Sequence, residues 1–356
     1  MTHIIENISL KAHNTFGINV MARYFSTFST AEELAALLES TRGHRSTVRI
    51  PAPHGNNPPS APRPPLILGG GSNILFTGNI DGLVLYNQVK GIQVVREDEK
   101  YVYVKVGAGE NWHGFVQYCL QRNWAGVENL SLIPGSVGAA PMQNIGAYGV
   151  EIKEVFYELE ARSLDDGKVY TFSLNDCQFG YRDSVFKRKY KGRFIILYVT
   201  FRLNKIPRFH TEYGAIREEL DNMGIGQLSI QAISRAVINI RSSKLPDPAV
   251  IGNAGSFFKN PTIPNQQFAA LQTKFPGIVG YPSPGGTTKL AAGWLIEQCG
   301  WKGFRRGDAG CHARQALVLV NYGNATGKEI YDLSEEIAQS VQNTFGVMLE
   351  REVNIF

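Results

Sequence analysis

The sequence predicts an α+β fold with two or three domains. Segments with the alternation of strands and segments with the spacing of amphipathic helices are mixed along the chain, without the strict strand–helix alternation of a doubly wound sheet. At 356 residues, 43% of them hydrophobic and 19% charged, the chain can bury several cores and has an ordinary globular composition.

Short apolar runs predict strands, and longer periodic segments predict helices. Strands are expected at 66–68, 83–86, 92–95, 101–106 and 194–203. Helices are expected at 31–40, 112–121, 229–242 and 289–299. A last helix, with apolar residues at 330, 333, 337 and 341, is expected to end at Gly346.

Charge, cysteine spacing and hydropathy argue against several classes of protein. The net charge of +5 suits anionic nucleotides but is not concentrated in a nucleic-acid module, and its densest stretch, 187–191, predicts a solvated hairpin. The four cysteines are widely spaced, which argues against a disulfide framework or a metal site and fits a reducing cytoplasm. Neither a signal peptide nor a membrane-spanning run is expected.

Residues 51–65 contain seven prolines. Proline fixes φ and removes a donor, so an exposed loop of polyproline character is expected. We interpret roughly 42–64 as containing an insertion tolerated at the surface, with partner binding as the alternative.

The most unusual segment is GNAGSFFKNP at 252–261. Its glycines permit close backbone approach or positive φ. Ser256 can present a hydroxyl to a ligand, and Phe257 and Phe258 can exclude water. The alternative is a glycine-rich loop with a serine helix cap and two core phenylalanines, and the segment alone leaves both open.

A triple glycine at 69–71 lies between two apolar runs. Consecutive N–H groups there can form a nest for phosphate oxygens. The Rossmann fingerprint fails because Ile74 occupies its third glycine position, and no Gly-Lys-Ser/Thr follows as in a Walker loop. A hairpin turn is the alternative.

The run 129–149, NLSLIPGSVGAAPMQNIGAYG, is rich in glycine, alanine and serine. A segment with so few large side chains is not expected to build a core. It can wrap a flat cofactor, which the polar side chains of Gln143, Asn144 and Tyr148 would orient. A flexible linker would be more polar. In FGYRDSVFK, at 179–187, Arg182 suggests a guanidinium held to recognise carboxylate or phosphate, with a structural pair to the neighbouring aspartate as the alternative.

Together these segments resemble the UDP-N-acetylenolpyruvoylglucosamine reductase family. The ordered matches are NTFG at 14–17, GGGSN at 69–73, GAGENWH at 107–113, the run at 129–149, FGYRDS at 179–184, KLPDP at 244–248, GNAGSFFKNP at 252–261, KLAAGWLIEQCG at 289–300, HARQALVLVN at 312–321 and LEREV at 349–353. The proline-rich segment departs from the family pattern.

The resemblance implies a two-part FAD-binding region of the vanillyl-alcohol-oxidase type at 1–220, divided near residue 88. An α+β substrate-binding domain is expected at 228–330, and the last helix and strand, 331–356, would close the site. The implied reaction uses NADPH to reduce non-covalent FAD. The flavin then reduces the enolpyruvyl ether of UDP-N-acetylglucosamine to UDP-N-acetylmuramate for peptidoglycan, and so serves cell-wall synthesis, shape and division.

The resemblance also implies residue roles. Arg182 matches the residue that meets the substrate carboxylate, Ser256 the proton donor, and Glu352 the acidic residue of the site, with Glu350 as the nearby alternative on the expected strand. The implied FAD contacts are Gly69, Gly70, Gly71, Ser72, Asn73, Ile133, Pro134, Gly135, Ser136, Gly138, Ala139, Gln143, Asn144, Gly146, Ala147, Tyr148 and Arg241.

Substrate contacts are implied for Tyr181, Tyr213, Lys244, Asn260 and Gln315. Tyr213 matches the mobile tyrosine loop of one of the family's two types. Arg241 and Lys244 can also complement the C-terminus of their helix. A cytoplasmic monomer without metal, nucleic acid or membrane partners is expected.

Two other functions stay open at this point, a flavin oxidase of the same superfamily and a nucleotide-binding module without catalysis. The presence together of Arg182, Ser256 and Glu352 argues against both. No histidine or cysteine is placed obviously for a covalent flavin link, and His113 is the nearest candidate.

Overall fold

The computed structural model describes residues 3–44 and 64–356. The proline-rich loop and most of the expected insertion lie outside the described residues. The chain divides into two compact units. The first comprises Met1–Ile8, Met21–Gly70 and Ile80–Arg241, and the second comprises Ser9–Val20, Gly71–Asn79 and Ser242–Phe356. The domain limits expected from the sequence stay a prediction.

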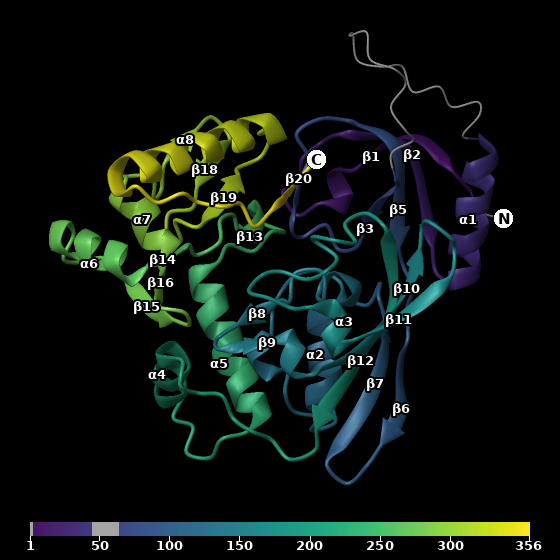
Figure 1. The fold of residues 1–356 in the computed structure, drawn as a ribbon, viewed down its shortest axis with the longest axis horizontal. Coiled ribbons are helices and arrows are strands. Elements are labelled where there is room, and N and C mark those ends of the chain that lie inside the picture. The colour runs from purple at the N-terminus through teal and green to yellow at the C-terminus, as the bar shows by residue number, and fades with distance from the viewer. Residues whose placement is uncertain (1–2, 45–63) are drawn as a thin grey trace. The chain divides into compact units, whose positions relative to one another are not determined.

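The first unit contains a four-stranded sheet of order β1-β2-β5-β3. Its strands β2, β5 and β3 run parallel. The helix α1 packs Leu34 and Leu37 into a core with Phe28 and Leu85. The elements are β1 (Ile5–Ser9), β2 (Met21–Phe28), α1 (Ala31–His44), β3 (Leu66–Leu68) and β5 (Ile80–Asn87), drawn in Figure 1.

A second, antiparallel sheet of the first unit has the order β11-β10-β12-β7-β6. Its centre is apolar because valines alternate along β7 and β12 is buried for most of its length. Trp112 and Phe115 of the helix α2 contact Phe201 of β12 edge to face or tilted. The elements are β6 (Ile92–Glu97), β7 (Tyr101–Gly107), α2 (Trp112–Gln121), β10 (Phe156–Ser163), β11 (Val169–Ser173) and β12 (Phe194–Asn204).

Short elements of the first unit carry the glycine-rich run. Leu130, Val137, Ala140 and Ile145 of this run are buried in the core, so the expectation that it cannot build a core is wrong. Its apolar residues point inward while its glycines form turns. The elements that carry the run are η2 (Glu128–Leu130), η3 (Val137–Ala139) and β8 (Gly146–Ala147). The remaining elements of the first unit are β9 (Val150–Glu151), η4 (Ile152–Glu154), α3 (Leu174–Cys177), α4 (Gly214–Asn222) and α5 (Ile230–Lys244), whose last three residues belong to the second unit.

The second unit contains an antiparallel sheet of order β13-β19-β18-β17 and a smaller sheet of order β14-β16-β15. A parallel pair, β4 (Ile74–Leu75) and β20 (Asn354–Ile355), joins the chain end to an early segment. The other elements are η1 (Lys11–His13), β13 (Gly252–Ser256), β14 (Thr262–Pro264), α6 (Asn265–Lys274), β15 (Gly280–Ser283), β16 (Thr287–Leu290), α7 (Ala292–Gln298), β17 (Arg305–Arg306), β18 (Ala309–Cys311), β19 (Val318–Asn321) and α8 (Gly327–Phe345).

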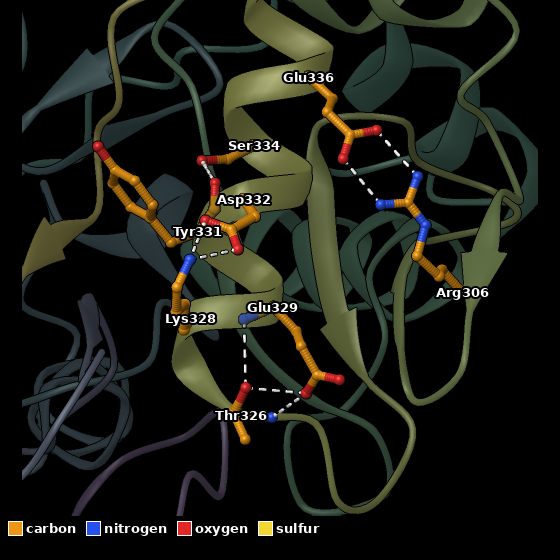
Figure 2. A network of polar contacts seen from close by, with 8 residues as sticks. All are labelled: Arg306, Thr326, Lys328, Glu329, Tyr331, Asp332, Ser334 and Glu336. Atoms are coloured by element: carbon orange, nitrogen blue, oxygen red, sulfur yellow. Dashed lines mark hydrogen bonds and ion pairs between the residues drawn. The ribbon is translucent and has the colours of Figure 1, made fainter.

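The helix α8 confirms the predicted last helix, because its four apolar positions are buried and Gly346 ends it with φ 65°. A capping box begins it, in which Thr326 and Glu329 exchange hydrogen bonds. Figure 2 shows this box together with the bidentate ion pair that Arg306 makes with Glu336, at 2.7 and 2.9 Å.

The strands and helices expected from periodicity are confirmed within a few residues, and the structure differs from the sequence-based expectations at five places. The helix expected at 289–299 begins at Ala292, because residues 287–290 pair in β16. The segment 252–256 is a strand rather than a loop, and 349–353 makes a single bridge rather than a strand. Residues 187–191 form successive turns rather than a hairpin, and β4 after the triple glycine pairs with β20, so 69–73 is no hairpin turn.

Candidate functional site

Two glycine-bearing turns of the first unit approach each other at the level of the main chain. A Cβ added to Gly70 would lie 2.8 Å from the Cα of Gly135, and one added to Gly69 would lie 2.1 Å from the Oγ of Ser136. A side chain at Gly70 would clash with the main chain of Gly135, so this position requires glycine, whereas a side chain at Gly69 would require the Ser136 hydroxyl to move. The approach brings the main-chain groups of both turns together, as a phosphate nest needs.

The beginning of α2 holds the second of these turns. Trp112 donates from its main-chain N–H to the carbonyl oxygen of Gly135 at 3.0 Å, and from Nε1 to that of Leu130 at 2.9 Å. His113 accepts a hydrogen bond at Nδ1 from the N–H of Leu132 at 2.9 Å. These anchors were not recognised in the sequence, although GENWH lies within a matching motif.

Arg241, on α5, lies beside the same turn. Its Nε donates to the carbonyl oxygen of Leu132 at 3.2 Å, and its guanidinium hydrogen-bonds to the Tyr148 side chain. Burial lowers the pKa of Arg241, and the nearby charge of Arg182 acts in the same direction. Two guanidinium groups this close favour binding of an anionic group.

Arg182 occupies the corner of a tight turn. Gly180 and Asp183 exchange main-chain hydrogen bonds of 3.0 and 3.3 Å, and Arg182 between them has φ 53°. Its Nη2 donates to the carbonyl oxygen of Gly146 at 2.6 Å. Asp183 forms its ion pair with Arg188 at 3.2 Å. The aspartate of FGYRDS therefore has an ion-pair partner in Arg188.

Asn144 connects the glycine-rich run to the Arg182 turn. Its Nδ2 donates to Glu151 Oε2 at 3.0 Å and to the carbonyl oxygen of Gly180 at 2.9 Å. Its Oδ1 accepts from the N–H of Lys153 at 3.2 Å. The residue is fully buried. The side chain is thus committed to the protein, which leaves the main chain for the cofactor contact expected of Asn144.

Tyr148 and Tyr213 meet edge to face, with ring centroids 5.5 Å apart. Tyr213 precedes α4 and is 53% exposed. Asn129, which is buried, donates from Nδ2 to the carbonyl oxygens of Tyr148 and His210, at 3.1 and 2.9 Å. This asparagine therefore links the glycine-rich run to the segment before Tyr213, and sequence reasoning had not assigned it any role.

Within the second unit, three of the matching motifs converge through main-chain contacts. Thr15 donates from N to the carbonyl oxygen of Gly71 at 3.1 Å, and from Oγ1 to that of Asn253 at 2.6 Å. A Cβ on Gly252 would lie 2.2 Å from the carbonyl oxygen of Phe16. NTFG, the end of the triple glycine and the start of GNAGS are therefore neighbours.

Ser256 ends β13 and is exposed, and the two phenylalanines after it are buried in the core. The alternative of two core phenylalanines is thus confirmed, but the serine is not a helix cap. The segment LEREV runs beside them, because Glu352 donates its N–H to the carbonyl oxygen of Phe257 at 2.8 Å. Asn73 Nδ2 contacts the carbonyl oxygen of Glu352 at 3.3 Å. The structure therefore brings Asn73, Glu352 and the residue after Ser256 together.

Two expected substrate residues meet at the first turn of α7. Asn260 Oδ1 accepts from the N–H of Ala292 at 3.0 Å. Gln315 Oε1 lies 3.2 Å from where a Cβ of Gly293 would stand. Lys244 is exposed at the end of α5.

The remaining expected residues fall in both units, with Tyr181 exposed beside the Arg182 guanidinium. Those in the glycine-rich run of the first unit are Ile133, Pro134, Gly138, Ala139, Gln143 and Ala147, and Ser72 belongs to the second unit. Gly138 is required for its contact with Ala108, whose Cβ would be 2.5 Å from an added Cβ. Arg182, Tyr148 and Arg241 are thus brought together in one unit, and Ser256 and Glu352 in the other.

Two family models match the chain. The FAD binding domain matches residues 60–173, and the C-terminal domain of UDP-N-acetylenolpyruvoylglucosamine reductase matches residues 247–356. The predicted fold class, an FAD-binding region followed by an α+β domain, is confirmed.

Full-length relatives and solved structures agree with these matches. The chain is 50% identical over 349 residues to the UDP-N-acetylenolpyruvoylglucosamine reductase of Pseudomonas savastanoi pv. phaseolicola, and 51% identical over 350 residues to that of Amoebophilus asiaticus, covering 98% of each sequence in both pairs. Its fold resembles UDP-N-acetylenolpyruvylglucosamine reductase from Thermus caldophilus, with a TM-score of 0.66, 24% identity and complete coverage of both chains. It also resembles 6-hydroxy-D-nicotine oxidase from Arthrobacter nicotinovorans, with a TM-score of 0.50 and 13% identity over 98% of this chain and 87% of the other. The chain is an FAD-dependent oxidoreductase and belongs to the UDP-N-acetylenolpyruvoylglucosamine reductase family.

Proposed function

We propose that the chain reduces the enolpyruvyl ether of UDP-N-acetylglucosamine to UDP-N-acetylmuramate, with NADPH as the source of the hydride. The observation that carries the proposal is the identity of about half of all residues to reductases of this name, over nearly the full length of both sequences. The presence of Arg182 in FGYRDS, Ser256 in GNAGSFFKNP and Glu352 in LEREV, the segments that resemble the family, supports the proposal.

The residues present fit a bound FAD. The close approach of Gly70 to Gly135 brings main-chain donors together for phosphate oxygens, and the partly buried Arg241 supplies a cation beside Leu132 of the second turn. When bound, FAD takes a hydride from NADPH and passes it to the substrate. Arg241, beside the turn that contains Leu132 and Gly135, would hold the diphosphate of FAD, and Tyr148 would orient the arginine.

The proposed catalytic residues manage charge and a proton. Arg182, held by its hydrogen bond to Gly146, would bind the substrate carboxylate and stabilise the negative charge that builds beside it. Ser256 would donate a proton to the carbon next to the carboxylate. A hydroxyl is a weak acid, but a strongly basic carbanion takes its proton readily. Glu352 would assist as a hydrogen-bonding or proton-donating acid.

Substrate recognition would use the residues that the family resemblance implies. Tyr213, exposed at the start of α4, fits a loop that closes over the nucleotide, and Lys244 would neutralise diphosphate. Asn260 and Gln315 flank the first turn of α7, and Tyr181 lies beside Arg182. Asn260 would contact substrate through its amide Nδ2, because its Oδ1 caps α7.

In the cell we propose that the chain acts as a cytoplasmic monomer, with effects on cell shape and division that follow from its place in peptidoglycan precursor synthesis. Within residues 3–44 and 64–356, no helix has both the length and the apolar character to cross a bilayer.

The test is an anaerobic titration of the purified protein, followed by flavin absorbance. NADPH should bleach the yellow flavin, and the enolpyruvyl substrate should then restore the colour. A colourless protein that cannot be loaded with FAD would contradict the proposal and favour a nucleotide-binding module. Reduction by an alcohol but not by NADPH would favour a flavin oxidase.

A further inference from the structure

A continuous chain of contacts runs from the first turn of α2 to the partly buried guanidinium of Arg241. We propose that His113 is a positioning residue for Arg241, and that it acts through the main chain of Leu132. The inference rests on the proposed role of Arg241 in holding FAD, and it assigns to His113 a task other than the covalent flavin link considered from the sequence.

The first step is the hydrogen bond from the Leu132 N–H to His113 Nδ1, at 2.9 Å. Nδ1 must be unprotonated to accept it, so a neutral His113 carries its proton on Nε2. Burial lowers the pKa of His113, and the charge of Arg241 acts in the same direction, which favours this neutral form. The histidine sits in the first turn of a helix whose beginning is capped by Asn111, so its ring has a rigid base.

The second step is the conformation of Leu132, whose φ is 58°. A leucine in the left-handed region is strained, because its Cβ crowds the carbonyl oxygen, and it persists only when its surroundings hold it there. Leu132 donates its N–H to His113 Nδ1, and its carbonyl oxygen accepts a hydrogen bond from Arg241 Nε at 3.2 Å. The strained residue therefore transmits the position of the imidazole to the guanidinium.

The third step explains why Arg241 needs to be held. The charge of Arg182 lies close enough to lower the pKa of Arg241, so the two cations repel each other before an anion is bound. The Leu132 carbonyl and the Tyr148 side chain oppose this repulsion by fixing the guanidinium. Without His113, Leu132 can relax out of the left-handed region, and its carbonyl turns away from Arg241.

The test measures the dissociation constant of FAD from apoprotein by flavin fluorescence. His113→Leu removes the acceptor and should weaken FAD binding about 5-fold to about 100-fold, because Leu132 no longer holds the Arg241 guanidinium in place for FAD. His113→Asn should bind FAD nearly as the parent does, because its Oδ1 can stand where Nδ1 stands. His113→Gln is the matched control, since it is polar but places its oxygen one bond farther out, and it should resemble His113→Leu.

A double-mutant cycle with Arg241→Lys separates positioning from general loss of structure, because lysine keeps a charge but has no Nε–H for Leu132. His113→Leu should have little further effect on FAD binding once Arg241 is lysine. Additive effects, or equal FAD binding by the Asn and Gln variants, would overturn the inference. If His113→Leu fails to fold, as circular dichroism of the apoprotein would reveal, the comparison of Asn with Gln decides. Unchanged FAD binding by Arg241→Lys alone would instead contradict the proposed role of Arg241.

Discussion

Lys259 forms an ion pair with Glu350, and the same two residues are joined by a hydrogen bond of 2.8 Å from the lysine N–H to the glutamate carbonyl oxygen. Glu350 is 72% exposed in this pair, whereas Glu352 is half-buried and adjoins Asn73 and Phe257 through its main chain. The two glutamates of LEREV, which the sequence pattern alone does not separate, therefore have different surroundings.

This difference predicts different results for two matched substitutions. Glu350→Gln should cost about 0.2–1 kcal/mol of stability, as an exposed ion pair does, and leave turnover nearly unchanged. Glu352→Gln should leave reduction of FAD by NADPH intact and slow flavin reoxidation by the enolpyruvyl substrate on the order of 10²–10⁴-fold. Stopped-flow absorbance of each half-reaction measures both. If Glu350→Gln slowed flavin reoxidation more than Glu352→Gln did, Glu350 rather than Glu352 would be the acidic residue of the site.

The proposed proton donor predicts a loss confined to one half-reaction. In Ser256→Ala, NADPH should still reduce FAD, whereas reoxidation by the enolpyruvyl substrate should slow on the order of 10²–10⁴-fold, because the carbanion lacks its acid. Ser256→Cys should recover part of the rate, since a thiol can also donate a proton.

Ser340→Ala, on α8, is the matched control because it makes the same substitution at a serine outside the proposed site. It should leave the rates of both half-reactions as in the parent protein. Equal slowing of both half-reactions in Ser256→Ala, or no slowing of the second, would remove Ser256 from the mechanism.

Non-covalent attachment of FAD predicts that heat or acid precipitation releases yellow flavin into the supernatant. His113, the residue nearest to a covalent role in the sequence, already uses Nδ1 to accept from Leu132. Absorbance of the supernatant and pellet after complete denaturation measures the release. Flavin that stays with the denatured chain would contradict the prediction.

A buried histidine of the second unit predicts a loss of stability in mild acid. Burial lowers the pKa of His312, and the charge of Arg314 acts in the same direction. An unfolded histidine titrates near pH 6.5, so below that pH the unfolded chain binds a proton that the folded chain still rejects. The free energy of unfolding should therefore decrease as the pH falls from about 6.5 to the folded pKa of His312. Above about pH 6.5 His312 is neutral in both states, so it should not destabilise the fold there.

The measurement is urea unfolding of the parent and of His312→Gln at about pH 7.5 and about pH 5.5. The parent should lose more stability than the variant between these two values. The comparison is made between variants because burial raises the pKa of Glu128, whose contribution changes with pH in the opposite direction. Equal losses in both proteins would show that His312 titrates normally in the fold.

Periodicity and motif order in the sequence predicted most of the fold. The valine alternation of β7 and the apolar stripe of α8 are local patterns, so they could be read from neighbouring residues alone. For the segment 252–256, a glycine-rich loop was one of the two interpretations left open, and glycine is generally unfavourable in strands. Pairing with β19 overrides that preference, and the register shift between Asn253 and Ser256 accommodates it.

The contacts that arrange the candidate site were less predictable, because they join residues far apart in the chain. Asn129 and Asn144 each use a single amide to hold two distant carbonyl or carboxylate oxygens, and nothing in their own neighbourhood indicates these partners. The left-handed conformation of Leu132 is equally hidden, since leucine is not a residue that favours it.

The pairing of β20 with β4 sets an order of events during synthesis. Thr77 donates its main-chain N–H to the carbonyl oxygen of Phe356 at 2.6 Å, and the rings of Phe76 and Phe356 are in contact at 6.4 Å. Before residues 354–356 are synthesised, Ile74 and Leu75 of β4 have no β20 strand to pair with. The β4–β20 pairing and the packing of Phe76 against Phe356 therefore cannot form until residue 356 has left the ribosome. Until then, the apolar residues around Phe76 lack these partners and are exposed to water or bound by chaperones.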